Sequence, residues 1–130
     1  MVDTLGLIWV VWVHAAGIQD FQSGKLLILM LLAQVQIITP RLQIIWADGI
    51  YTSMVDWVKR LGLAFRLEVV KRSDKLKEFV PLPKRWIVER TFAWLGRYRR
   101  LSKDYEYETR SSEAMIRVAS IHLMVRRLVT

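Results

Sequence analysis

The chain has 130 residues, of which 53% are hydrophobic and 25% charged, a composition that predicts one globular domain and excludes intrinsic disorder and a second full domain. Its 20 Lys and Arg outnumber its 12 Asp and Glu, and the net charge of +8 favours polyanionic partners such as nucleic acid. The absence of cysteine excludes disulfide scaffolds, Fe–S clusters, cysteine-bearing zinc sites and thiol catalysis.

Charge and hydrophobicity are unevenly distributed along the chain. Residues 1–56 carry 2 basic and 4 acidic side chains (net −2), whereas residues 57–130 carry 18 and 8 (net +10). The longest apolar runs, Leu5–Val13 and Leu26–Ala33, are far shorter than the roughly 20 residues that a bilayer-spanning helix needs. No basic stretch precedes the first run, as it would in a signal peptide, so we expect no membrane partner and a cytoplasmic address.

The first part of the chain predicts a strand, a helix and a second strand. Residues Gly6–Val13 are rich in Ile, Val and Trp without helical spacing, which is typical of a strand buried on both faces. Good helix formers fill Gln19–Ala33, which predicts a buried helix. The apolar run Leu42–Ala47 predicts a short strand that stops at the turn pair Asp48-Gly49.

A helix, a strand and a loop are expected next. Ser53 is a candidate N-cap for a helix that reaches Leu61, and Gly62 is its expected C-terminal stop. The alternating segment Leu63–Val70 predicts a third strand, and the charged, proline-punctuated segment Lys71–Pro83 predicts a loop.

Two helices complete the predicted order βαβαβαα, an α/β domain. Apolar and aromatic residues recur at three- and four-residue spacing from Lys84 to about Lys103, which predicts an amphipathic, strongly basic helix. The last helix is expected over Ser111–Leu128. Five of its residues form one stripe that we expect to face the core: Ala114, Val118, Ile121, Val125 and Leu128.

Asp48 is the first candidate site residue. Ligands of open α/β sheets gather at the carboxyl ends of strands, and Asp48 directly follows a fully apolar predicted strand. Its carboxylate would stand at the rim of the sheet beside the open backbone of Gly49, as a hard-cation ligand needs. The alternative is a plain Asp-Gly turn.

Glu89 is the second candidate, on the basic helix. Helical spacing places it on one face with Arg85, Trp86, Phe92 and other mostly apolar residues, and we expect this face to pack near the domain. A carboxylate in such a place is costly unless it is paired or binds metal. Either Arg85 forms an intrahelical ion pair with Glu89, or Glu89 and Asp48 jointly hold a divalent cation beside a phosphodiester strand.

The basic helix is also the candidate nucleic-acid contact. Between Lys84 and Lys103 the only acid is Glu89, whereas a solvated helix normally mixes charges of both signs. A solvated basic face remains the alternative to phosphate binding. The candidate DNA-binding residues are Arg85, Arg90, Arg97, Arg99, Arg100 and Lys103.

Six segments together resemble the catalytic region of bacterial insertion-sequence transposases of the DDE type. They are VDTLGL, VHAAGIQD, IIWADGIY, VKRSD, LPKRWIVERTFAWLGRYRRLSKDYE and SSEAMI, and the likeness runs from Val2 to Leu128. The resemblance implies an RNase H-like fold, two divalent ions (Mg²⁺ or Mn²⁺) and a triad of two Asp and one Glu. These activate water, and then a DNA 3′-hydroxyl, for attack on phosphodiesters.

Matched to the motifs, Asp48 in WADGIY corresponds to the second aspartate and Glu89 in WIVERTF to the glutamate. Arg85 corresponds to an arginine four residues before that glutamate. The basic residue found seven positions after it in some relatives is Gly96 here, and the adjacent Arg97 is the candidate substitute.

The first aspartate has no match, because in similar transposases it lies on a strand upstream of VDTLGL. Asp3 and Asp20 align with other, non-triad positions. The RNase H-like strand order 3-2-1-4-5 then implies a partial fold of about three strands and four helices that lacks the first two strands. Residues 1–130 would be the C-terminal part of a DDE transposase catalytic domain. The strand Leu5–Val13 would then lose its neighbour, and its unpaired backbone groups would favour aggregation or strand swapping between copies of the chain. The chain would be either a decayed or mis-started remnant or the second half of a transposase whose first half is read from another frame.

The resemblance therefore implies DNA transposition by metal-dependent phosphodiester hydrolysis and strand transfer, acting on transposon ends and target DNA. Because one triad carboxylate is unmatched, we expect the chain to be inactive alone. The alternative is a non-catalytic, basic DNA-binding remnant that holds phosphates without cleaving them.

Overall fold

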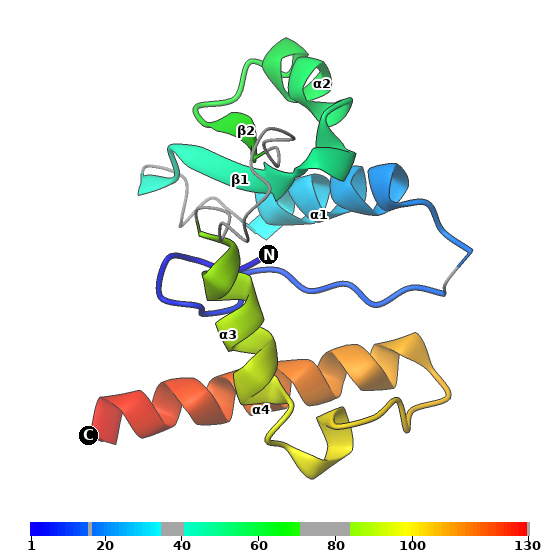
Figure 1. Ribbon diagram of the computed structural model, residues 1–130, viewed down its shortest axis with the longest axis vertical. Coiled ribbons are helices and arrows are strands. Elements are labelled where there is room, and N and C mark those ends of the chain that lie inside the picture. The colour runs from blue at the N-terminus through cyan, green and yellow to red at the C-terminus, as the bar shows by residue number, and fades with distance from the viewer. Residues whose placement is uncertain (16, 35–40, 71–83, 130) are drawn as a thin grey trace, which may run out of the picture. The chain divides into compact units, whose positions relative to one another are not determined.

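The computed structural model describes residues 1–15, 17–34, 41–70 and 84–129 (Figure 1). The chain divides into two compact units: the continuous unit, Gly17–Lys84, and the discontinuous unit, Met1–Ala16 with Arg85–Thr130. The described residues form four α-helices, two short 3-10 helices and a two-stranded sheet, so the fold is mixed α/β. Within these residues, no helix is both long enough and apolar enough to cross a membrane.

A parallel pair of strands forms the sheet of the continuous unit. β1 (Ile44–Asp48) and β2 (Arg66–Val70) run in register, with Ile44 opposite Arg66 at one end and Asp48 opposite Val70 at the other. Both strands lie where the hydrophobic runs predict them, although β2 begins three residues later than expected. The predicted loop Lys71–Pro83 lies outside the described residues.

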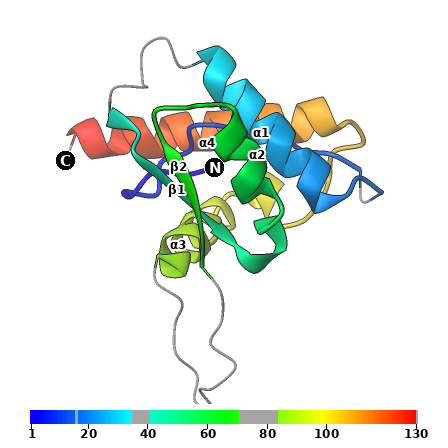
Figure 2. The same cartoon turned by 90° about the horizontal axis from the view of Figure 1, so that it is seen from above.

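Two helices cover the core of this unit. α1 (Asp20–Gln34) contacts α2 (Met54–Arg60), and α2 packs on β2 (Figure 2). Burial of apolar surface is the main stabilising contribution here. Among the described residues of the unit, the buried apolar ones are Ile28, Leu31, Ile45, Met54, Val58, Phe65 and Leu67.

The two ends of α2 differ in how well they were predicted. Gly62 has φ +61°, a left-handed conformation typical of the residue that stops a helix, so the predicted stop is confirmed. Ser53 stands at the N-cap position, but its side chain makes no capping hydrogen bond, and that part of the prediction is wrong. The reason is that Thr52 and Ser53 both have helical backbone angles, so the chain enters α2 from a preceding helical turn rather than from extended backbone.

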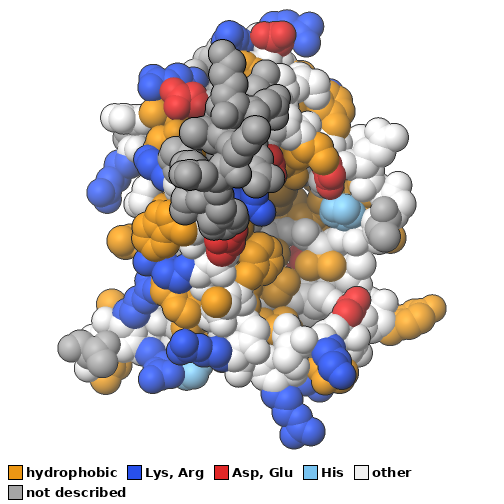
Figure 3. Space-filling view, viewed as in Figure 1, with side chains coloured by type: hydrophobic (Ala, Val, Ile, Leu, Met, Phe, Trp, Pro, Cys, Tyr) orange, Lys and Arg blue, Asp and Glu red, His pale blue; other side chains and the backbone are white. Residues whose placement is uncertain are grey.

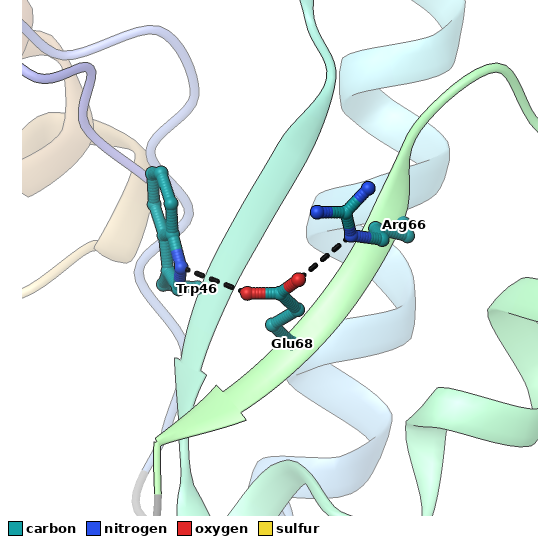
Figure 4. Close-up of polar contacts among 3 residues, drawn as sticks. All are labelled: Trp46, Arg66 and Glu68. Carbon is teal, nitrogen blue, oxygen red and sulfur yellow. Dashed lines mark hydrogen bonds and ion pairs between the residues drawn. The ribbon is translucent and has the colours of Figure 1, made fainter.

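A polar cluster links the two strands on an exposed face of the sheet (Figure 4). The Trp46 Nε1–H donates to Glu68 Oε2 at 3.2 Å, and the Arg66 Nε–H donates to Glu68 Oε1 at 2.7 Å. The Lys84 ammonium lies 3.2 Å from the centroid of the Trp46 ring. The hydrogen bond from Arg66 lowers the pKa of the Glu68 carboxyl below its ordinary value. Exposed ion pairs of this kind contribute little to the free energy of folding. The effect of the cluster is to orient the side chains of Trp46, Arg66 and Glu68 relative to one another.

The discontinuous unit begins with a tight reversal of the chain. Val2 and Ile8 form an isolated antiparallel bridge, flanked by hydrogen bonds from Asp3 N–H to Leu7 O (2.9 Å) and from Trp9 N–H to Met1 O (3.1 Å). Beyond this single bridge, residues 1–15 form no strand, so the prediction of a strand over Gly6–Val13 is wrong. The described residues therefore hold two strands rather than three.

The reason lies in the partners of this segment. A strand exists only through hydrogen bonds to a neighbour, and among the described residues the pairing stops at the bridge. Further on, the Val13 N–H donates to Glu113 Oε1 at 3.0 Å instead of to another strand.

The basic segment forms a shorter helix than expected. α3 (Arg85–Leu95) ends eight residues before Lys103, and the chain continues through a 3-10 turn, η3 (Arg99–Leu101). Gly96 follows α3 directly, and Tyr98 is extended (φ −84°, ψ 124°). Glycine is a poor helix former, so the helix breaks here although the apolar spacing continues.

α4 (Thr109–Val129) crosses and contacts α3 within the same unit (Figure 1). Its fully buried residues are Ala119 and Ser120, not the predicted stripe. Ile121 is 55% exposed and Leu128 86%, and the other members of the stripe, Ala114, Val118 and Val125, are exposed as well. The assignment of the core face of α4 from its sequence is therefore wrong.

Candidate functional site

Asp48 is the last residue of β1, at the carboxyl end of the parallel pair. Its side chain is exposed, and Oδ1 accepts the Gly49 N–H, which caps the short 3-10 helix η2 (Gly49–Tyr51). The two interpretations of the sequence are thus compatible, because Asp48 forms the Asp-Gly turn and also stands at a strand end. Oδ2 takes no part in this cap and fits the donor chemistry of a hard cation.

Tyr51 is a neighbour of Asp48 that the sequence did not single out, and Asp20, which the motifs align with a non-triad position, lies near Tyr51 as well. Burial raises the pKa of the Tyr51 hydroxyl, and the negative charges of Asp20 and Asp48 raise it further. A hydrogen bond with Ser23 has the opposite effect and lowers the pKa of Tyr51. The three-residue spacing of Asp48 and Tyr51 in WADGIY was a signal for this proximity, whereas nothing in the sequence indicated that Asp20 of α1 lies near them.

Glu89 lies on α3 in a more exposed position than expected. Its side chain is 65% exposed, and its neighbours Trp86 and Phe92 on the same face are exposed too. The expectation that this face packs near the domain is therefore wrong, because α3 buries Ile87, Thr91 and Leu95 instead. The intrahelical ion pair is present, with the Arg85 Nε–H donating to Glu89 Oε1 at 3.0 Å.

The exposure of Glu89 leaves its chemistry open to a ligand. An exposed i, i+4 ion pair contributes little to the free energy of folding. Arg85 therefore orients the Glu89 carboxylate but does not prevent it from binding another cation. Oε2 accepts no hydrogen bond from the described residues and can serve as a cation ligand.

A cation shared by Asp48 and Glu89 stays a prediction, since one belongs to the continuous unit and the other to the discontinuous unit. In the described ranges, no group of three or more His, Asp or Glu side chains is placed to hold a metal ion. Asp48 and Glu89 each have one carboxylate oxygen that accepts no hydrogen bond from the described residues, and each could therefore donate one ligand to such an ion.

Three of the six candidate DNA-binding residues have partners inside the protein. Arg85 pairs with Glu89, and Arg100 pairs with Glu106. Arg90 is the most enclosed of them: its Nη2–H donates to Leu5 O at 2.9 Å, and its guanidinium lies between two tryptophan rings.

The other three candidates are Arg97, Arg99 and Lys103, which lie between α3 and α4. Their side chains are exposed and make no ion pair or hydrogen bond with another described residue. On the face shown in Figure 3, basic and hydrophobic side chains lie next to one another on the surface of the discontinuous unit. Exposed, unpaired cations are the groups that can neutralise phosphates at little desolvation cost.

Comparison with known proteins identifies the family. The family model described as "Transposase DDE domain" matches residues 1–124, which include Asp48, Glu89 and all the candidate basic residues. No curated protein matches the chain, and no solved structure does. The match covers nearly the whole chain and agrees with the motifs, so the protein belongs to the DDE transposase family.

Proposed function

We propose that this chain contributes two carboxylates, Asp48 and Glu89, to a metal-dependent site that hydrolyses DNA phosphodiesters and transfers strands during transposition. The observation that carries the proposal is the position of Asp48, an exposed carboxylate at the carboxyl end of a parallel strand pair, inside a matched transposase DDE domain. Ligands of α/β sheets gather at this edge. In an RNase H-like sheet, β1 and β2 would be the fourth and fifth strands.

Acidic residues would bind the metal ions, and basic residues would bind the DNA. Two Mg²⁺ or Mn²⁺ ions, held partly by Asp48 and Glu89, would activate the attacking oxygen and stabilise the leaving one. Arg85 keeps the Glu89 carboxylate oriented through its hydrogen bond. Arg97, Arg99 and Lys103 have exposed cationic groups and would hold the phosphates of transposon ends and target DNA.

The complete site needs a third carboxylate. Because the motifs leave the first aspartate of the triad unmatched, we propose that an upstream half of the transposase supplies it, in the bacterial cytoplasm. This chain would then be the C-terminal part of the catalytic domain. Alone, it loses transition-state charge stabilisation, and we expect cleavage to be slower than in a complete site by a factor on the order of a thousand.

Mn²⁺ binding by the purified chain tests the two carboxylates without requiring activity. We expect Asp48→Asn and Glu89→Gln each to lower Mn²⁺ affinity at least tenfold, measured by electron paramagnetic resonance titration with duplex DNA present. Glu68→Gln is the matched control, because Glu68 is also an ion-paired acid but lies among β-sheet residues. Unchanged affinity in both site variants would contradict the proposal, and robust cleavage abolished by Glu89→Gln would contradict only the inactivity.

A second candidate function is DNA binding without catalysis. It is favoured by the three exposed cations, Arg97, Arg99 and Lys103, which make no pair with another described residue. This function requires neither carboxylate, so it predicts that Asp48→Asn and Glu89→Gln leave both Mn²⁺ binding and DNA affinity unchanged.

A further inference from the structure

The first reversal of the chain is organised by Asp3. Its Oδ1 accepts the N–H groups of Leu5 (2.9 Å) and Leu7 (2.8 Å), and its backbone O accepts the Gly6 N–H (3.0 Å). Gly6 has φ +82°, a conformation that other residues rarely adopt. Asp3 and Gly6 together therefore give the turn one defined shape, with the Leu5 and Gly6 carbonyls available to other groups.

Two consecutive residues of α3 bind those two carbonyls. The Arg90 Nη2–H donates to Leu5 O at 2.9 Å, and the Thr91 hydroxyl lies 2.9 Å from Gly6 O and 3.0 Å from Ile87 O. Thr91 is buried. We call these four residues, Asp3, Gly6, Arg90 and Thr91, the turn clamp.

The contact between turn and helix leaves no spare space. A Cβ atom added at Gly6 would come within 2.9 Å of Thr91 Oγ1 and 2.9 Å of Trp94 Cζ3, both tighter than real Cβ contacts. Van der Waals overlap of this size forces the Thr91 or Trp94 side chain, the turn or the helix to shift.

Arg90 is held from both sides as well. Its guanidinium carbon lies 4.5 Å from the centroid of the Trp86 ring and 4.7 Å from that of Trp94, and its buried Nε has no hydrogen-bond partner among the described residues. Cation–π contacts stabilise a charge in this position. Enclosure by two rings and a carbonyl gives Arg90 an internal role, although the sequence suggested a phosphate contact.

We propose that the turn clamp sets the rotation of α3 about its axis and thereby aims Glu89, so that Asp3, Gly6, Arg90 and Thr91 are positioning residues for the metal site. The inference rests on the proposed function for the role of Glu89 itself. Glu89 directly precedes Arg90 and Thr91, and each residue turns the helix by about 100°, so fixing those two fixes the direction of the third. The apolar anchors of α3, Ile87 and Leu95, select the buried face, and the hydrogen bonds of Arg90 and Thr91 add the directional constraint that hydrophobic contacts lack.

Distance measurements between spin labels test the clamp without any metal or DNA chemistry. The chain has no cysteine, so labels can be placed at Glu89→Cys on α3 and at Ala114→Cys, an exposed position on α4 of the same unit. In the full chain we expect a narrow distance distribution. Thr91→Val and Gly6→Ala should shift it or at least double its width, because each removes or distorts the contact between turn and helix.

Matched variants separate positioning from general damage. Thr91→Ser keeps the hydroxyl and should restore the narrow distribution, and Gly17→Ala, whose Cβ meets nothing within 4 Å, should leave it unchanged. A second label pair within α4, Ala114→Cys with Leu128→Cys, should be unaffected in every variant that folds. If Gly6→Ala fails this control, the comparison of Thr91→Val with Thr91→Ser decides.

A wild-type distribution in a folded Thr91→Val variant would overturn the proposal, and so would a Thr91→Ser variant as broad as Thr91→Val. Mn²⁺ binding that is insensitive to both Asp48→Asn and Glu89→Gln would instead overturn the proposed function. The label distances would still report whether the clamp directs position 89.

Discussion

At the residue scale, Tyr51 reports the surroundings of Asp48. Its hydroxyl is partly buried and lies near two acidic side chains, Asp20 and Asp48, and all three causes favour the neutral phenol. Because the pKa of Tyr51 is higher in the folded than in the unfolded chain, the neutral phenol stabilises the fold fully below its ordinary pKa. This contribution is lost as the pH rises through the raised value.

We expect Asp48→Asn to lower the pKa of Tyr51 towards its ordinary value, because one of the two nearby negative charges is removed. Spectrophotometric titration of tyrosine absorbance measures the shift, and the Tyr51→Phe variant assigns the transition among the four tyrosines. Asp56→Asn on α2 is the matched control, since Asp56 is not among the charges that act on Tyr51. An identical titration for Asp48→Asn and the wild type would contradict the proximity of Asp48 and Tyr51.

At the element scale, the sequence predicted most helices and both strands of the continuous unit. An apolar run that stops at Asp48-Gly49 indicates a strand end from local chemistry alone, and Gly62 indicates a helix stop in the same way. The conformation of Gly6–Val13 could not be predicted from local chemistry, because residues of high strand propensity form a strand only when a neighbouring strand pairs with them.

Faces of helices were harder to assign than their existence. α4 has apolar residues on two opposite sides, and periodicity identifies both stripes without saying which one packs in its own unit. The same ambiguity applies to α3, where Glu89 shares an apolar face that turned out to be exposed. The position of Asp48 was thus predictable, whereas the exposure of Glu89 was decided by tertiary packing.

The two faces of α4 should respond differently to substitution. Ile121 is exposed, so Ile121→Ser should change the free energy of unfolding by no more than about 0.5 kcal/mol. Ala119 is buried, so Ala119→Leu should destabilise the protein by about 1–3 kcal/mol through overpacking. Urea unfolding followed by circular dichroism compares the two, and an equal loss in both would mean that Ile121 belongs to a packed face.

At the scale of the whole molecule, the two structural units carry equal net charges, whereas the two halves of the sequence do not. Each unit has 10 basic and 6 acidic residues, a net charge of +4, although residues 1–56 are net negative and residues 57–130 net positive. The units are equal because the continuous unit, Gly17–Lys84, contains 8 of the 18 basic residues that follow residue 56. Net charge therefore does not select one unit as the DNA contact, and the availability of individual cations must decide.

We expect Arg97→Ala combined with Arg99→Ala to reduce the salt dependence of DNA binding. Each lost phosphate contact lowers the slope of log affinity against log salt by about 0.9, so the double variant should lower it by about 2. Fluorescence anisotropy at several salt concentrations measures the slope. Arg66→Ala, which removes a cation already paired with Glu68, should leave it unchanged, and a wild-type slope in the double variant would exclude these two arginines as phosphate contacts.

The division of the discontinuous unit between the two ends of the chain has a consequence during synthesis. Residues Met1–Ala16 leave the ribosome well before the helix residues that bind their turn, which follow only after the whole of Gly17–Lys84. At translation rates of about 5–20 residues per second, the 85 residues that separate Leu5 from Arg90 take about 4–17 s to be made, and the apolar segment waits that long for its partners. The nascent chain therefore presents Leu5–Val13 to chaperones, or to other nascent chains, before its own fold can cover it.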